Sequence, residues 1–396
     1  MAQIPSGEYK TYDGTSVVFG PGAIQHLREK VEELGGKRAL VVTGRTIMTK
    51  TDLVEHVKSV LNERYAGVFG GVLQHVPRQC VIEGARMARE IGSDVLISLG
   101  GSSPVDAAKG INLALTEVEQ IDDFFIKFDR SNTTKNAEFK EDKLPLLAIP
   151  TTLSASEFTM LTGITDTERR HKDGYSDTRL LSKVVIMDPE MTIPTPKELW
   201  AGTGMKLLSD RLALVCSQHP LPFTDALGLH AIRLINQYLV RSVSKPIDLE
   251  SRAMLQHATW MRAPGMGFYG SGIVAALRHQ IGAVYNVGHG VASTIVLPHC
   301  INFNRPLIDE RLIVVARALD LPIKGKGTKS IANAVINRVE ELIGELGLPT
   351  RLRDVGVPKE GLPVIAESTW MAPSSRNNFR SVDSVEQILG ILEQAW

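Results

Sequence analysis

Residues 96–109 read Leu-Ile-Ser-Leu-Gly-Gly-Ser-Ser-Pro-Val-Asp-Ala-Ala-Lys, and this stretch decides the fold of the first half of the chain. A short apolar run, of the kind that forms a buried strand, breaks into small residues, and a helical pattern follows at once. Glycines let the backbone come close to a ligand, and the free N–H groups of a new helix favour phosphate. The stretch predicts a strand, a phosphate-binding turn and a helix. A tight turn without a ligand is the alternative.

Similar apolar, β-branched runs recur on both sides of this stretch, with helical patterns between them. We expect strands at residues 16–19, 38–43, 95–99, 146–149 and 183–187, and helices at 23–34, 52–63, 81–91 and 104–115. Strands that are apolar at almost every position are buried on both faces, as in a parallel sheet. The alternation therefore predicts a doubly wound α/β domain.

After about residue 196 the pattern changes to helices alone. We expect helices at residues 225–241, 249–260, 311–319 and 330–346. A chain of 396 residues is long enough for two domains, and prolines punctuate the stretch before the change. We therefore expect an α/β domain over residues 1–192 and an all-helical domain over residues 193–396.

The composition excludes several classes of protein. Lys+Arg and Asp+Glu number 44 each, so no positive excess is available for nucleic acid or a membrane surface. No stretch reaches the roughly 18 consecutive apolar residues of a membrane span, and the first residues do not read as a secretion signal. Cys80, Cys216 and Cys300 are widely scattered, which predicts buried small residues rather than disulfides or a thiolate metal site. We expect a cytoplasmic protein that acts on a small molecule.

Two further glycine patterns are not expected to bind a ligand. Residues 265–270 read GMGFYG and fit GxGxxG letter for letter, but no expected strand precedes them. Gly202-Thr203-Gly204 is interpreted as a turn at the entry of a helix. Neither pattern therefore competes with the turn at residues 100–103.

The turn has a recognisable family likeness. GGSSPVDAAK at residues 100–109 resembles the GGGSxxDxAK signature of the iron-containing alcohol dehydrogenase superfamily, which includes the maleylacetate reductases. The likeness continues in order through residues 149–157, 188–189 and 204–205 to HQIGAVYNVGHG at 279–290. It implies an N-terminal dinucleotide-binding domain, a helical C-terminal domain, a reaction cleft between them and a homodimer. The segment TTLSASE at 151–157 is one residue shorter than usual, which is similar to the maleylacetate reductases.

The resemblance also implies where a nicotinamide dinucleotide would bind. The pyrophosphate would be lined by Gly100, Gly101 and Ser102. Thr151 and Thr152 would lie beside the adenine-ribose side, and Asp106 would lie near the nicotinamide. Lys172 matches the cofactor-contacting lysine of the family. The alternative for Lys172 is an exposed lysine in a polar run.

The segment after the second strand bears on the choice of cofactor. Family members that prefer NAD commonly carry an aspartate where this chain has Gly44, and that carboxylate repels a 2′-phosphate. Arg45, with Thr43 and Thr46, could instead donate charge-assisted hydrogen bonds to the phosphate. We expect NADP(H) to be preferred over NAD(H). A solvated loop arginine is the alternative for Arg45.

The metal-binding pattern of the family is largely absent from this sequence. The family holds its metal with one Asp and three His, and the resemblance places Lys206, Asp210, Ala275 and His289 at those positions. An ammonium group at a ligand position repels a divalent cation. We therefore expect no metal.

Without a metal, another group must stabilise the negative charge that hydride transfer leaves on a carbonyl oxygen. Lys206 is the expected substitute, and Asp210 lies four residues on, at ion-pair spacing in a helix. An ion pair without a chemical role is the alternative. His279, which matches a non-ligand histidine of the family's cleft, is the expected proton donor, and His289 is the second candidate.

These residues indicate a metal-independent NAD(P)H-dependent reductase that acts on a small carbonyl compound or an activated alkene. An acidic substrate would suit Lys206, Arg211 and Arg278 if they face the cleft. Two other functions stay open at this point. One is a metal-free lyase or isomerase on the same fold, and the other is a catalytically inactive dinucleotide-binding protein.

Overall fold

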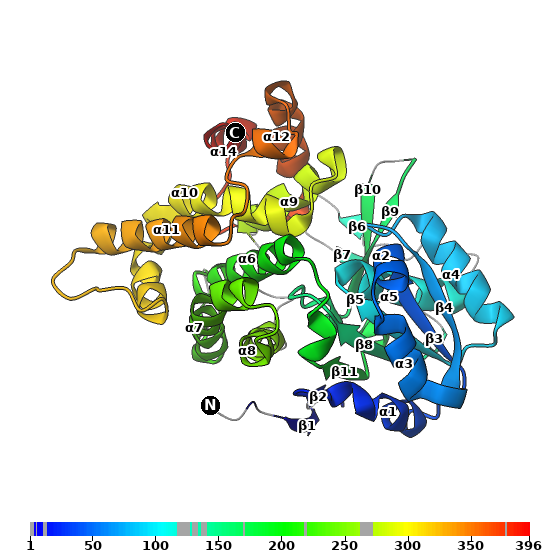
Figure 1. Ribbon diagram of the computed structural model, residues 1–396. Helices are drawn as coiled ribbons and strands as arrows, with labels where there is room; N and C mark the ends of the chain where they lie inside the picture. Colours follow the sequence, from blue (N-terminus) through cyan, green and yellow to red (C-terminus); the bar gives the residue numbers. More distant parts are fainter. Residues whose placement is uncertain are drawn as a thin grey trace. The chain divides into compact units, whose positions relative to one another are not determined.

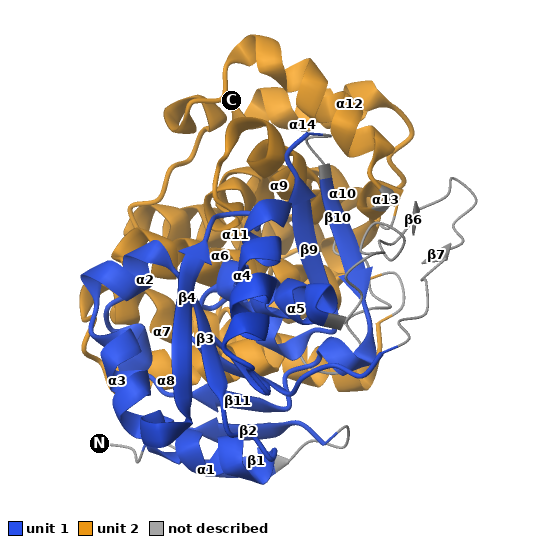
Figure 2. Cartoon of the chain, turned by 90° about the vertical axis from the view of Figure 1, so that its right-hand side faces the viewer, with its two compact units in different colours: residues 1–195 blue, residues 196–396 orange. Residues whose placement is uncertain are grey.

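The chain divides into two compact units, residues 1–195 and residues 196–396 (Figure 2). The computed structural model describes residues 4, 6–10, 14–116, 127–128, 134–135, 141–168, 171–217, 220–261, 272–376 and 378–396. The boundary expected from the sequence, between residues 192 and 193, lies just before the end of the first unit. No helix among the described residues is long and apolar enough to cross a membrane.

A seven-stranded sheet forms the centre of the first unit (Figure 1). In spatial order its strands are β1 (Gly7–Lys10), β2 (Ser16–Phe19), β11 (Val184–Met187), β8 (Leu146–Pro150), β5 (Val95–Gly100), β3 (Ala39–Gly44) and β4 (Tyr65–Val72). The β1–β2 pair is antiparallel, and the other neighbouring pairs are parallel. The α/β fold class predicted from the sequence is confirmed, with one antiparallel strand at an edge of the sheet.

Helices cover both faces of this sheet. They are α1 (Leu27–Glu33), α2 (Arg45–Lys50), α3 (Leu53–Leu61), α4 (Arg78–Glu90) and α5 (Ser102–Thr116), with short 3-10 turns η1 (Ala23–His26), η2 (Asn62–Arg64), η4 (Ser156–Phe158), η5 (Thr178–Leu180) and η6 (Glu190–Thr192). Leu40 and Val42 of β3 join the cluster that contains α4 and α5 residues. Ala39 and Val41 point the other way, into the cluster with α1 and α3 residues. This alternation explains why the central strands are apolar at consecutive positions.

Strand β4 was not expected from the sequence. Its residues read YAGVFGGV, and glycines are depleted in strands because they add flexibility and no side chain to pack. One of these glycines is needed for the packing of a helix. A Cβ on Gly70 would collide with the side chain of Met48, so the absence of a side chain lets α2 pack over the edge strand.

A β-hairpin, β9 (Leu161–Asp166) paired with β10 (His171–Ser176), was also not expected. Ile164 and Tyr175 are buried and belong to the same cluster as α4 and α5. The hairpin therefore packs against α5, and its other residues are mostly polar, which hides the strand pattern. A third sheet consists of β6 (Lys127–Phe128) and β7 (Thr134–Lys135).

Every regular element among the described residues of the second unit is helical, as predicted. Its helices are α6 (Lys197–Val215), α7 (Pro222–Ser244), α8 (Leu249–Trp260), α9 (Gly272–Tyr285), α10 (His289–Ala318), α11 (Thr328–Glu345), α12 (Leu362–Met371), α13 (Pro373–Arg376) and α14 (Val385–Ala395), with 3-10 turns η7 (Leu352–Val355) and η8 (Lys359–Gly361). The helix expected at 311–319 is only the end of α10, which contains Pro298 and Pro306. Proline disfavours a helix interior, so the sequence pattern predicts an interruption at Pro298 and Pro306. The helix nevertheless continues through both residues.

The helices α6 and α10 cross at two glycines. A Cβ on Gly290 would lie 2.6 Å from the carbonyl carbon of Gly202, so the two backbones are in direct contact. A Cβ on Gly204 would likewise collide with Leu239 of α7. The interpretation of residues 202–204 as a helix-entry turn is therefore wrong, because these glycines lie inside α6 and permit close helix packing. Residues 265–270 lie outside the described residues.

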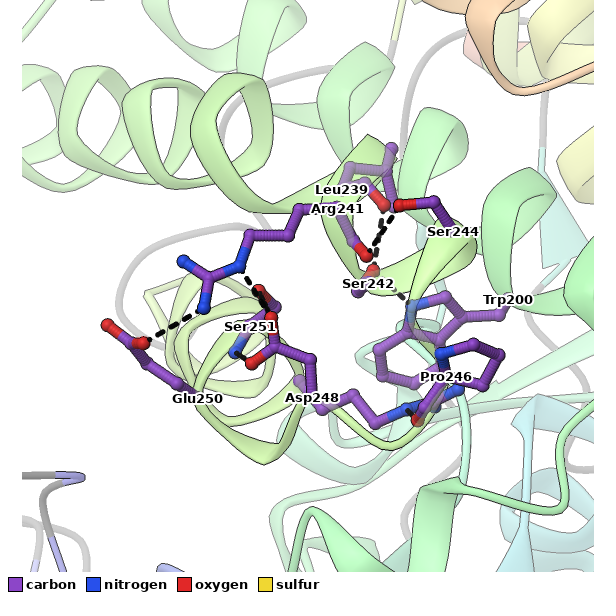
Figure 3. A network of polar contacts seen from close by, with 10 residues as sticks. Trp200, Leu239, Arg241, Ser242, Ser244, Pro246, Asp248, Glu250 and Ser251 are labelled. Carbon is purple, nitrogen blue, oxygen red and sulfur yellow. Dashed lines mark hydrogen bonds and ion pairs between the residues drawn. The ribbon is translucent and has the colours of Figure 1, made fainter. Parts of the chain in front are cut away.

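The first turn of α6 is fixed by a polar network at the corner between α7 and α8 (Figure 3). Trp200 Nε1 donates a hydrogen bond to Ser242 Oγ at 2.9 Å. The buried guanidinium of Arg252 lies 4.5 Å from the Trp200 ring, and burial lowers the pKa of Arg252 to about 10. Arg241 and Asp248, an ion pair, close the same corner. Because α6 also carries Lys206 and Asp210, this corner anchors the helix that holds them.

Candidate active site

The turn between β5 and α5 carries the glycine motif of the first unit. Gly100 has a φ of 140°, and a Cβ there would lie 2.8 Å from Pro104. A Cβ on Gly101 would lie 3.0 Å from Thr152 Oγ1. Helix α5 begins at Ser102 with no acidic residue in its first turn, so its N-terminal N–H groups keep their attraction for an anion. The predicted strand, turn and helix are therefore present, and Gly100 and Gly101 leave the backbone of the turn without side chains.

Thr151 and Thr152 follow the adjacent strand β8 and are both buried. The Thr151 N–H donates to the Gly100 carbonyl at 2.9 Å, which fixes the two turns side by side. The Thr152 hydroxyl is buried and has no hydrogen-bond partner among the described residues. A buried hydroxyl without a partner costs free energy, so Thr152 is suited to contact a ligand at the turn.

Asp106 and Lys172 form an ion pair between α5 and strand β10, with Lys172 Nζ at 3.6 Å from Asp106 Oδ2. Burial raises the pKa of Asp106, while the charges of Lys172 and Lys109 oppose this shift. Lys172 also helps to lower the pKa of His75, although burial of the imidazole is the larger cause. Lys172 is therefore not the freely exposed lysine of the alternative interpretation.

Lys109, the last residue of the motif, has a structural position. Its side chain is fully buried, and its ammonium group donates to the carbonyls of Ser156, Thr159 and Leu161 at 2.8, 2.5 and 3.1 Å. These bonds tie α5 to the loop that follows Thr152. Lys109 thus connects the helix after the glycine turn to the segment after Thr152.

The cofactor-selecting segment lies at the end of β3. Gly44 is the N-cap of α2, and Arg45, the first residue of that helix, is exposed. Thr43 cannot contact a phosphate as suggested, because its side chain is fully buried and its hydroxyl donates to the Leu99 carbonyl at 2.8 Å. Ile47 of α2 lies against Gly100, which brings this segment to the glycine turn.

The second unit holds a compact ionic cluster, the Asp210 cluster, made of Lys206, Asp210 and Arg278. Lys206 Nζ lies 2.8 Å from one oxygen of Asp210, and Arg278 Nη1 lies 2.8 Å from the other. The exposed fractions of the three side chains are 13%, 5% and 7%. The ion pair expected between Lys206 and Asp210 is therefore present, and Arg278 from α9 completes it.

The two candidate histidines lie next to each other. The rings of His279, on α9, and His289, the first residue of α10, have centroids 4.8 Å apart in an edge-to-face arrangement. His279 is exposed and His289 is half-buried. His279 directly follows Arg278 on α9, so this helix supplies one residue of the histidine pair and one residue of the Asp210 cluster.

The four residues that the resemblance assigns to metal ligands, Lys206, Asp210, Ala275 and His289, offer few donors. Both Asp210 oxygens contact cations, Lys206 is itself a cation, and Ala275 has no donor atom. His289 is the only other residue of these four whose side chain commonly binds a metal ion. The part of the chain that the structure describes contains no group of three or more His, Cys, Asp or Glu side chains that could hold a metal ion.

Sequence reasoning did not identify Arg278 as a partner of Asp210. The two residues are 68 positions apart, so no local spacing signals their contact. Arg278 was expected only as a charge near an acidic substrate. The three cysteines are buried and free, as predicted, and burial raises the pKa of Cys216 to about 12.

Comparisons with known proteins identify the family of both halves of the chain. Residues 14–189 match the model of the iron-containing alcohol dehydrogenases, and residues 200–396 match that of the C-terminal region of the same family. The NAD-dependent methanol dehydrogenase of Bacillus methanolicus is 30% identical over 96% of this chain and 97% of its own. The maleylacetate reductase of Burkholderia cepacia is 28% identical over 90% and 89%.

A solved structure gives the same result at the level of the whole chain. The crystal structure of a 1,3-propanediol oxidoreductase superposes with a TM-score of 0.88 and 29% identity, and it covers 100% of both chains. Sequence and fold thus match along both units. The chain belongs to the iron-containing alcohol dehydrogenase family of NAD(P)-dependent oxidoreductases.

Proposed function

We propose that this chain is a metal-independent reductase of a small carbonyl compound or activated alkene, with NADPH preferred over NADH. The observation that carries metal independence is the double ion pair of Asp210. Its two oxygens already contact Lys206 and Arg278, each at 2.8 Å. A divalent ion would have to displace these cations and bind beside them, and each positive charge opposes its binding. The residues at these positions therefore do not fit a divalent metal.

The residues of the glycine turn do fit a dinucleotide. Gly100 and Gly101 keep the turn free of side chains, and the N-terminus of α5 attracts phosphate. The buried hydroxyl of Thr152 has no hydrogen-bond partner among the residues that the structure describes. Gly44 and the exposed Arg45 would accept a 2′-phosphate without repulsion. When bound, the reduced nicotinamide supplies the hydride that adds to the substrate.

Lys206 has the electrostatic role in this proposal. Addition of hydride to a carbonyl carbon turns the C=O group into an alkoxide, and the Lys206 ammonium donates a hydrogen bond to that oxygen as charge develops. Asp210, which also contacts Arg278, holds the ammonium in place, so little reorganisation is needed. A proton from His279 or His289 then converts the alkoxide into the alcohol. The exposed ring of His279 can take up the replacement proton from water.

The test is to mix the purified protein with NADPH and a panel of aldehydes, ketones and activated alkenes, and to follow absorbance at 340 nm. We expect cofactor oxidation that persists after treatment with a chelator, and elemental analysis with less than one transition metal per chain. Stoichiometric iron or zinc together with loss of turnover on chelation would contradict metal independence. A change in substrate with no change in absorbance would favour a lyase or isomerase.

A further inference from the structure

The turn between β4 and α4 has a strained backbone. His75 and Val76 have φ values of 62° and 53°, in the left-handed region that residues with a side chain rarely adopt. Val76 is also β-branched and fully buried, which makes this conformation unusual. Two such residues in succession cost free energy, so neighbouring groups must hold the turn in place.

Thr165 of the β9–β10 hairpin contacts both strained residues. Its N–H donates to the Val76 carbonyl at 2.8 Å, and its hydroxyl donates to the His75 carbonyl at 2.6 Å. A parallel bridge between Pro77 and Thr165 extends this contact to the residue before α4. Every residue except proline has a backbone N–H, so only the hydroxyl bond depends on which side chain occupies position 165.

The same threonine lies opposite Lys172 in the hairpin. Thr165 and Lys172 are direct partners in the antiparallel register, so their side chains share one face of the hairpin. From that face the Lys172 ammonium reaches Asp106 of α5, at 3.6 Å. Burial and the charge of Lys172 both lower the pKa of His75, which agrees with a lysine near the turn. One residue pair thus contains both the contact to the strained turn and the lysine at Asp106.

A separate contact holds the opposite face of the hairpin. Arg78 Nη2 lies 3.6 Å from Asp166 and 3.5 Å from Asp173. These aspartates directly follow Thr165 and Lys172 in the chain, so they project from the other face. The ionic contacts with α4 do not depend on the Thr165 hydroxyl. Loss of that hydroxyl should therefore change the position of this end of the hairpin without detaching it.

We infer that Thr165 is a positioning residue: its hydroxyl holds the hairpin against the strained His75–Val76 turn and so keeps the Lys172 ammonium at Asp106. Without this bond the turn can relax toward unstrained dihedral angles, and the residue pair moves with it. The inference rests on the proposed function only where it concerns the cofactor, which the family resemblance brings to Lys172 and Asp106. Thr165 then acts on cofactor binding through Lys172.

The first experiment measures the position of Lys172 without any cofactor. The protein is treated with limiting acetic anhydride, and mass spectrometry gives the acetylation rate of Lys172 relative to the exposed Lys183. Thr165→Val should raise this relative rate by about three- to tenfold, the factor that one hydrogen bond supplies. Thr165→Ser keeps the hydroxyl and should react like the wild type. Equal rates in wild type and Thr165→Val would overturn the inference.

The second experiment measures cofactor binding in a double-variant cycle. Fluorescence titration gives the Kd for NADPH of the wild type, Thr165→Val, Lys172→Met and the double variant. Thr165→Val should weaken binding by about three- to tenfold, and the double variant should bind no more weakly than Lys172→Met. If the losses of the two single variants multiply, Thr165 does not act through Lys172 and the inference is wrong. A wild-type protein that binds no NADPH would contradict the proposed function, and the acetylation rates would still decide on Thr165.

Thr259→Val is the matched control. It removes another buried threonine hydroxyl that donates to a backbone carbonyl, that of Leu255 at 2.9 Å, in α8 of the second unit. The acetylation of Lys172 and the Kd for NADPH should stay as in the wild type, and a change like that of Thr165→Val would overturn the inference. If Thr165→Val folds poorly, Thr165→Ala removes the same hydroxyl and is judged by the same two measurements.

Discussion

Lys172 on the second strand of the β9–β10 hairpin lies 3.6 Å from Asp106 on α5 and forms an ion pair with it. The ion pair connects α5, which starts at the glycine turn, to the β9–β10 hairpin, which the sequence analysis did not predict. A Cβ on Gly163, on the facing strand, would collide with the Lys172 side chain, so this glycine gives the lysine its path to Asp106. The lysine is therefore positioned by the hairpin rather than by chance on a polar surface.

The first prediction concerns this pair. Lys172→Met removes the charge that opposes the raised pKa of Asp106, so Asp106 should bind a proton more readily. If Lys172 contacts the cofactor, NADPH binding should weaken by about tenfold. Fluorescence titration at two pH values measures both effects. Lys183→Met, an exposed lysine of the same unit, is the control, and identical dissociation constants for the two variants would remove Lys172 from the cofactor site.

A second prediction tests the preference for NADPH. Gly44→Asp places a carboxylate at the N-cap of α2, where it would repel a 2′-phosphate. NADPH binding should weaken by about 1 to 3 kcal/mol, while NADH binding should be equal or tighter. Titration of both cofactors with wild type and variant gives the ratio. Equal or tighter binding of NADPH by the variant would contradict a phosphate site beside Gly44.

The third prediction separates catalysis from stability at Lys206. Lys206→Met keeps most of the length of the side chain and removes the ammonium, so turnover should fall about 10²- to 10³-fold with cofactor affinity little changed. Steady-state kinetics and a cofactor titration measure the two quantities. A small decrease in melting temperature with nearly normal turnover would instead mean that Lys206 only neutralises Asp210.

A fourth prediction addresses the proton donor. His279→Ala should lower turnover by about 10²-fold if His279 delivers the proton, and the pH dependence of kcat should lose one ionisation. The control is His230→Ala, which changes an exposed histidine of α7. Unchanged turnover in His279→Ala, combined with a loss in His289→Ala, would assign the role to His289.

The fifth prediction is a pH dependence of stability. Burial lowers the pKa of His257 and of His299 below the usual value of 6.5. The unfolded chain therefore binds more protons than the folded chain just below pH 6.5, so the free energy of unfolding should fall as the pH drops from about 7 to 5. Urea unfolding at several pH values measures this slope. His299→Gln should flatten it, and a slope equal to that of the wild type would mean that His299 does not contribute.

The sequence predicts the parts of the fold that local patterns encode. The apolar run of β5 and the small residues before Ser102 predict the strand, turn and helix that the structure contains. Strand β4 escapes prediction because its glycines serve helix packing rather than strand formation. The contact between Asp210 and Arg278 escapes it for another reason. It depends on how α6 and α9 pack, and no spacing within either helix encodes that.

The double pairing of Asp210 also constrains how such a site could change over time. Asp210→His alone would leave Lys206 and Arg278 with no anion between them, and Lys206→Asp alone would place two carboxylates beside one guanidinium. The three side chains are nearly buried, so a change at one of them alters the electrostatic environment of the other two. Substitutions within this cluster should therefore be non-additive: the loss of stability from changing Asp210 and Arg278 together should be smaller than the sum of the two single losses.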